Sequence, residues 1–110
     1  MRKAKTAKEI LIASRWLLVN HGWCRFYQHA IVKAMGHDKH SFCALGALLI
    51  VEKKFSYYEA YDKLVDALPS DYNFLLSDRG AHLAEWNDDY RRTKEQVIKL
   101  FDRAIKSCDE

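Results

Sequence analysis

Two identical pairs of potential metal ligands stand out in the first half of the chain. Each pair is a His followed three residues later by a Cys: His21 with Cys24, and His40 with Cys43. Imidazole and thiolate are the ligands of structural zinc sites, in which the second pair often opens a helix. The residues between the pairs are aromatic and apolar, unlike the polar loop of a small metal module. Zinc therefore stays an alternative, and we expect a fold that needs no cofactor.

Cys43 could also act as a nucleophile. We expect it at the first turn of a helix, where the positive end of the helix dipole favours the thiolate. His40 could then serve as the general base, with Asn87 or Asp88 orienting its ring. No local signature of a known cysteine hydrolase surrounds Cys43, so a binding role is favoured over catalysis.

A second polar cluster, Trp86, Asn87 and Asp88, lies shortly before the clearest helix start in the chain. A Trp at a helix end buries its indole, and Asn and Asp side chains bond nearby backbone groups in turns. Negative charge is also favoured near the start of a helix. We therefore predict that the cluster serves architecture. The alternative is a buried Asp88 carboxylate paired with Arg92 or with a cation of a partner.

Three capping-box sequences mark the helices that should position these groups. They are "TAKE" at Thr6, "SYYE" at Ser56 and "TKEQ" at Thr93, and apolar residues at helical spacing follow each one. In such a box the Ser or Thr side chain and the Glu or Gln three residues later each cap a backbone N–H. The pattern predicts helices over residues 7–20, 57–67 and 94–107.

The middle of the chain is less regular. Residues 42–52 are almost uniformly apolar, which predicts a central helix wrapped by the others, with Ser41 as its cap. A buried strand at "ALLIV" is the competing interpretation. Residues 23–40 fit either a short strand pair or a helix. At 110 residues the chain suits one all-α domain, residues 1–110, built as a compact bundle of four or five short helices.

The charge is unevenly distributed. Residues 1–55 carry ten Lys or Arg against three Asp or Glu, while residues 56–110 carry eight against twelve. The asymmetry fits either attraction between the two halves or an acidic partner. A nucleic-acid interface is possible but not favoured, because the charges of the first helix lie opposite its apolar stripe, as on any solvated helix. That interface would use Arg2, Lys3, Lys5, Lys8 and Arg15 with Trp16, Trp23, Phe26 and Tyr27.

Aromatic residues gather near the start of the helix over residues 57–67. Tyr61 should lie in the core, whereas Tyr57 and Tyr58 cannot both point inward. An exposed Tyr beside the basic half would suit a protein interface. The sequence therefore favours a protein partner, and it specifies neither that partner nor the oligomeric state.

The number of cysteines and the length of the apolar segments indicate in which cellular compartment the protein is expected. Three cysteines are an odd number, and the first apolar run is broken by Arg15 and offers no cleavage site for a signal peptidase. No window reaches the roughly 18 uninterrupted apolar residues that a membrane span needs. We expect a cytoplasmic protein with reduced thiols and no membrane association.

The motifs "HGWC", "FCALGAL", "AEWND" and "RRTKEQVIKLFDRAI" resemble those of a small uncharacterised bacterial and phage family, a domain of unknown function. The resemblance extends from about residue 7 to 105, and the segment between Cys24 and Ser41 departs from it. It implies a phage or mobile-element origin and no known activity. The positions that match its motifs are Trp23, Cys43, Trp86, Asn87, Asp88, Arg92 and Thr93.

Together these features predict a small intracellular accessory or regulatory protein that acts by protein–protein binding. Trp23, Trp86, Asn87, Asp88, Arg92, Thr93, Tyr57 and Tyr58 are its candidate interaction or structural residues. Three alternatives stay open. They are a zinc-stabilised domain, a cysteine hydrolase and a nucleic-acid-binding module.

Overall fold

The computed structural model describes residues 6–27, 29–34, 37–51 and 55–109. Within these residues the chain forms five helices and one antiparallel hairpin, which confirms the predicted mainly helical class. The elements are α1 (Ala7–Asn20), β1 (His29–Ala34), β2 (His37–Phe42), α2 (Ala44–Val51), α3 (Phe55–Ala67), α4 (Arg79–Asp88) and α5 (Lys94–Ser107). Arg2, Lys3 and Lys5, considered above for nucleic acid, lie outside the described residues.

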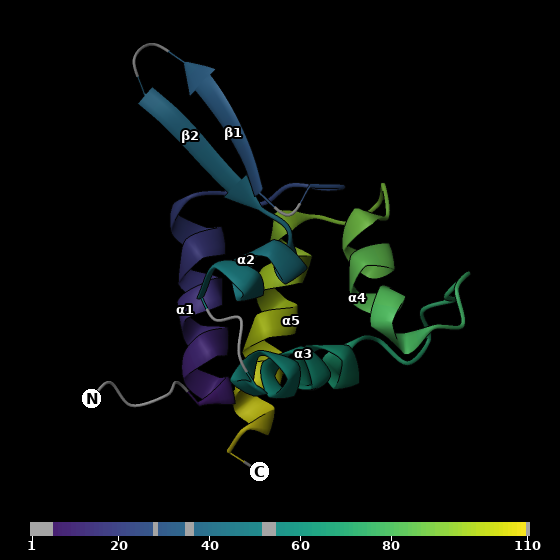
Figure 1. Cartoon of the computed structure of the whole chain (residues 1–110). Coiled ribbons are helices and arrows are strands. Elements are labelled where there is room, and N and C mark those ends of the chain that lie inside the picture. Colours follow the sequence, from purple (N-terminus) through teal and green to yellow (C-terminus); the bar gives the residue numbers. More distant parts are fainter. Residues whose placement is uncertain (1–5, 28, 35–36, 52–54, 110) are drawn as a thin grey trace.

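α1 and α5 form an antiparallel pair at one side of the molecule, and both have the predicted bounds (Figure 1). Both capping boxes are present. The Oγ1 atoms of Thr6 and Thr93 accept hydrogen bonds from backbone N–H groups three residues later, at 3.1 and 3.2 Å. Two exposed ion pairs join the helices, Lys8 with Asp109 at 2.7 Å and Arg15 with Asp102 at 2.6 Å. The described part of the basic half thus attracts the acidic half.

α2 is a helix, so the competing strand interpretation of residues 47–51 is wrong. The predicted cap at Ser41 is also wrong, because β2 continues through Ser41 to Phe42. Cys43 takes that place, since its Sγ accepts a hydrogen bond from the N–H of Gly46 at 3.2 Å. α2 packs against α1, α3, α4 and β2, and its small residues Ala44, Gly46 and Ala47 are buried in these contacts.

α3 crosses one end of the α1–α5 pair (Figure 1). It begins at Phe55, so the predicted cap at Ser56 is wrong and Ser56 lies inside the helix. The Tyr61 hydroxyl donates a hydrogen bond to the carbonyl oxygen of Gly80 at 2.8 Å and thereby ties α3 to the start of α4. Asp78 caps α4, because its carboxylate accepts the N–H of Gly80 at 2.9 Å.

The hairpin resolves the ambiguity of residues 23–40 in favour of strands. β1 and β2 pair from His29 opposite Phe42 to Ala34 opposite His37, and the hairpin extends beyond the helices (Figure 1). At its base, residues 22–24 run parallel to the end of β2. There the N–H of Cys24 bonds the carbonyl of Phe42 at 3.0 Å, and the N–H of Phe42 bonds the carbonyl of Gly22 at 2.9 Å. A side chain at Gly22 would crowd β2, because a Cβ there would meet the His40 carbonyl oxygen at 3.4 Å.

The core lies where the five helices meet. Its largest buried side chains include Ile10, Leu11, Leu18, Leu48, Leu64, Leu83, Trp86, Val97, Leu100 and Phe101. Residues 68–78 form a loop outside this core. The loop packs on α4 through Phe74, whose ring stacks on His82 at 4.0 Å, and through the N–H groups of Leu75 and Leu76, which both donate to Glu85 at 2.9 Å. None of the described helices is long and apolar enough to cross a membrane.

Candidate functional site

Asn87 is the centre of the polar cluster at the end of α4, and it is 1% exposed. Its Oδ1 accepts hydrogen bonds from the Trp23 indole N–H at 2.7 Å and from the Ala44 N–H at 3.0 Å. Its Nδ2 donates to the Cys24 carbonyl at 3.2 Å and to the Asp88 carboxylate at 3.0 Å. A buried amide with every bonding position satisfied holds its partners in one arrangement. Asn87 therefore joins α4, the first turn of α2 and residues 23–24.

Asp88 and Arg25 continue this junction. Asp88 accepts the N–H of Phe26 at 2.8 Å, and Phe26 adopts the left-handed backbone with φ 71°. That conformation costs a residue other than Gly roughly 1–2 kcal/mol. Arg25 stacks on the Trp23 ring at 4.7 Å and donates to the carbonyl groups of Asp89, Tyr90 and Arg92. Residues 23–26 are thus clamped onto the elbow between α4 and α5 by contacts that span more than sixty residues of sequence.

The alternative considered for Asp88, an ion pair with Arg92, is not among the contacts of the described residues. The Arg92 guanidinium instead lies over the Trp86 ring at 3.9 Å and donates to the Trp86 carbonyl at 2.9 Å and to Gln96 at 3.2 Å. Asp89, the next carboxylate, accepts hydrogen bonds from Arg91 and from the Tyr72 hydroxyl. Its pKa is lowered chiefly by the Arg91 side chain.

Cys43 lacks the surroundings of an activated nucleophile. Its side chain is 7% exposed, and burial raises the pKa of its thiol. The sulfur already accepts the Gly46 N–H as the cap of α2. A raised pKa favours the unreactive thiol over the thiolate, so the geometry gives the hydrolase interpretation no support. Asp88 and Cys43 do not share an open cleft, because Cys43 is buried.

The two His/Cys pairs do not form a metal centre in the described structure. The His21 and His40 rings approach edge to face with centroids 6.3 Å apart. The Cys24 sulfur donates to the Tyr27 carbonyl at 3.2 Å, while the Cys43 sulfur caps α2. In the part of the chain that the structure describes, no three His, Cys, Asp or Glu side chains are placed to hold a metal ion. The zinc interpretation therefore receives no support.

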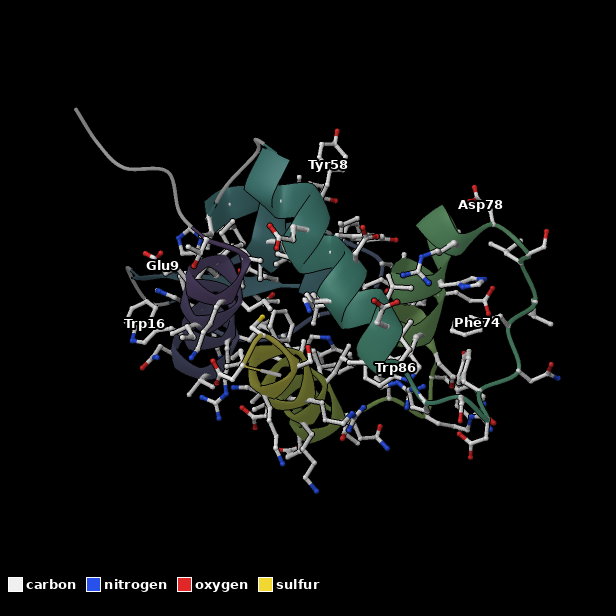
Figure 2. All side chains as sticks on the ribbon, turned by 90° about the horizontal axis from the view of Figure 1, so that it is seen from below. Glu9, Trp16, Tyr58, Phe74, Asp78 and Trp86 are labelled. Carbon is white, nitrogen blue, oxygen red and sulfur yellow. The ribbon has the colours of Figure 1, made fainter. Side chains whose placement is uncertain are left out.

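A shallow apolar groove, open to solvent, lies between α1 and α2. It has a volume of about 350 Å³ and is lined by Ala13, Trp16, Leu17, Ile50 and Val51. Trp16 is 56% exposed and Ile50 is 53% exposed. Trp16 points outward at the edge of the molecule opposite the loop that carries Phe74 and Asp78 (Figure 2). The groove offers hydrophobic contact and little else, so it suits binding and not catalysis.

Comparison with known proteins gives a family. The sequence profile of a family of unknown function (DUF6197) matches residues 2–107. The chain belongs to this family. No curated protein and no solved structure matches the chain. The match bears out the resemblance to an uncharacterised domain, and it supplies no activity for this DUF6197 protein.

The groove was missed by reasoning from the sequence, which considered Trp16 only as a base-stacking residue. A local signal was present. Ile12, Trp16 and Val19 recur at helical spacing on the face of α1 that lies away from the core, and all three are exposed. Of these three, Trp16 lines the groove. Of the predicted tyrosines, Tyr57 is half-buried and Tyr58 is exposed, as expected from their adjacent positions.

Proposed function

We propose that this DUF6197 protein is a binding protein whose α1–α2 groove receives an apolar helix of a partner protein, with acidic residues flanking the apolar face of that helix. The observation that carries the proposal is the groove itself. Two large side chains, Trp16 and Ile50, stand more than half exposed at its wall. Trp is enriched among the residues that dominate protein interfaces.

The lining of the groove limits what it can hold. Its five lining residues are all apolar. A polar ligand would lose hydrogen bonds to water there and gain none. An amphipathic helix instead places apolar side chains at every third or fourth position, which suits a groove bounded by two helices.

Charge favours an acidic partner over a second copy of the chain. The groove belongs to residues 1–55, whose sequence carries ten Lys or Arg against three Asp or Glu, although Lys8 and Arg15 among them are already paired with Asp109 and Asp102. A two-fold dimer through this face would bring two basic halves together, and like charges at an interface disfavour association. A helix rimmed by Glu or Asp would be attracted by the same charges.

Nucleic acid is less well supported as a partner. Lys8 and Arg15, two of the cations in question, form ion pairs with Asp109 and Asp102. Each of these side chains would have to leave its carboxylate before it could neutralise a phosphate. Trp16, by contrast, can meet a protein partner without breaking an ion pair of the described structure.

The test uses a designed peptide of about 16 residues, with Leu along one helical face and Glu along the other. We expect the peptide to bind and to shift the Trp16 indole signal in a nitrogen–proton correlation spectrum. Trp16→Ala should abolish binding, while Tyr58→Ala, which removes an equally exposed aromatic ring outside the groove, should leave it unchanged. A peptide with Lys in place of Glu should bind at least about five-fold more weakly.

Two results would refute the proposal. One is equal loss of peptide binding in Trp16→Ala and Tyr58→Ala, which would make the contact non-specific. The other is self-association of the protein, measured by sedimentation, that Trp16→Ala removes. That result would assign the groove to a second copy of the chain.

A further inference from the structure

A second pocket lies on the other side of the molecule, at the elbow between α4 and α5. Its volume is about 420 Å³, within the usual range for small-molecule sites. The loop over residues 69–73 forms one wall through Tyr72, and Trp86, Arg91, Arg92 and Gln96 form the others. Trp86 lies on the inner side of that loop, and Trp16 is at the opposite edge (Figure 2). The pocket is therefore separate from the α1–α2 groove.

Trp86 contributes a hydrogen-bond donor that the fold does not use. The residue is 2% exposed, and its indole N–H meets no acceptor among the described residues. A buried donor without an acceptor costs about 1–3 kcal/mol, and such groups are rare in folded proteins. Trp86 is one of the residues that line the pocket, although its indole nitrogen is itself covered, so an acceptor brought by a ligand could satisfy the N–H once the side chains around it shift.

Arg92 contributes a buried positive charge. It is 9% exposed, and no carboxylate of the described residues forms an ion pair with it. Asp89 interacts electrostatically with Arg92, but its hydrogen bonds go to Arg91 and Tyr72. Burial lowers the pKa of Arg92, and the neighbouring Asp89 and Tyr72 oppose that shift. Its bonds to the Trp86 carbonyl and to Gln96 fix the guanidinium plane at the pocket wall.

Within the described residues the Trp86 N–H lacks an acceptor and the Arg92 cation lacks an ion pair, and an anionic oxygen of a ligand would satisfy both. We propose that the elbow pocket binds the phosphate or carboxylate group of a small molecule, with the Trp86 N–H and the Arg92 guanidinium as donors. Guanidinium groups bind both oxyanions through paired hydrogen bonds. Arg91 stands at the exposed rim, and Asp71 also lines the pocket. Arg91 is paired with Asp89, so Asp71 and Asp89 balance the two arginines in number, and an anionic group would be held by the directed N–H groups of Arg92 and not by an excess of positive charge.

The experiment follows the indole N–H signals of the three tryptophans during titration with sodium phosphate or sodium succinate. Sodium chloride keeps the ionic strength constant. Trp16→Phe and Trp23→Phe assign the signals while Trp86 stays intact. We expect a saturable shift of the Trp86 signal alone. A shift with phosphate only identifies a phosphate ligand, and a shift with succinate only identifies a carboxylate. No saturable shift with either anion would overturn the proposal.

Variants separate a built site from general charge attraction. Arg92→Lys should weaken binding by about ten-fold or more, because Lys cannot make paired bonds to an oxyanion. Arg91→Gln changes an exposed residue and should weaken it by roughly three-fold. Lys99→Gln is the matched control, since it removes one positive charge from the exposed face of α5 outside the pocket. Equal weakening by Arg91→Gln and Lys99→Gln would contradict a specific site.

The peptide and anion tests are independent. Trp16→Ala should leave the anion-induced shift of the Trp86 signal unchanged. Loss of that shift in Trp16→Ala, with the helical circular dichroism intact, would contradict the assignment of the anion to the elbow pocket. Failure of peptide binding at the groove has no bearing on it.

Discussion

α1 and α5 are antiparallel neighbours of 14 residues each, and each begins with a capping box, yet their outer faces differ. The outer face of α5 is charged, with Glu95, Lys99, Asp102 and Arg103 exposed. The outer face of α1 carries Ile12, Trp16 and Val19, which are also exposed. Since α5 folds with a polar outer face, the fold does not require apolar residues there. The apolar residues on the outer face of α1 are therefore available for another purpose, and for Trp16, which lines the groove, we propose that this purpose is binding.

The largest expected effect is a difference in the free energy of unfolding between a variant on the inner face of α5 and a variant on the outer face of α1. Phe101→Ala should lower the free energy of unfolding by about 3–5 kcal/mol, because Phe101 is fully buried. Trp16→Ala should lower it by less than about 1 kcal/mol, because the ring is more than half exposed. Urea denaturation followed by circular dichroism measures both. Similar losses would place Trp16 in the core and remove the basis of the comparison.

The next effect concerns how α5 is attached, since the elbow before it is held by Asn87. Asn87→Ala should cost about 3 kcal/mol, because the Trp23 and Ala44 N–H groups would lose their buried acceptor. The control is Asn20→Ala at the end of α1. Asn20 is exposed, and among the described residues its side chain bonds its own helix, through the Trp16 carbonyl at 2.9 Å. The same denaturation assay should show a loss below about 0.5 kcal/mol for it. An equal loss in both variants would mean that the junction is not a stabilising element.

A smaller loss of stability is expected when the capping box that α1 and α5 share is removed from either helix. Thr6→Ala and Thr93→Ala each remove the side chain that caps the third N–H of a helix. Each should cost about 1 kcal/mol. Thermal unfolding of the two variants should give closely similar shifts of Tm. A loss confined to Thr93→Ala would show that the two capping boxes are not equivalent and that α1 is held mainly by packing.

The smallest effect is the part of the pH dependence of stability that comes from Asp89, at the elbow before α5. Hydrogen bonds from the Arg91 side chain, the Arg91 N–H and the Tyr72 hydroxyl lower the pKa of Asp89 below its ordinary value of 3.8. Because the folded pKa is the lower one, the stabilisation is complete above the unfolded pKa and is lost as the pH falls below it. Asp89→Asn and Arg91→Gln should both flatten the decline in stability between about pH 4 and 2. An unchanged profile in Asp89→Asn would show that this carboxylate does not contribute to acid stability.

How far the sequence could specify the structure depended on the range of each interaction. The bounds of α1 and α5 were predicted correctly, because a capping box and an apolar stripe act within one helix. The caps at Ser41 and Ser56 were wrong. Strand pairing extends β2 through Ser41, and α3 begins before Ser56. Ser41 pairs with Ala30, eleven residues earlier, and a capping pattern that spans four residues does not include that partner.

The same distinction applies to the site residues. The sequence suggested that Asn87 and Asp88 would bond nearby backbone groups, whereas their partners include Trp23, Cys24 and Phe26. Nothing local to Asn87 specifies those partners. The elbow pocket is equally non-local, since its walls come from a loop, from the end of α4 and from the start of α5. The exposed apolar residues of α1, Ile12, Trp16 and Val19, could by contrast have been predicted from their helical spacing, although they were not.

The sulfur cap of α2 gives the molecule a built-in reporter. Cys43 is closed off by the same first turn that its sulfur helps to hold, while Cys24 and Cys108 are only half-buried. A thiol reagent can therefore reach Cys43 only in those moments when that turn unwinds. The rate at which such a reagent modifies Cys43 therefore measures how often the first turn of α2 opens, and no label has to be added to the protein.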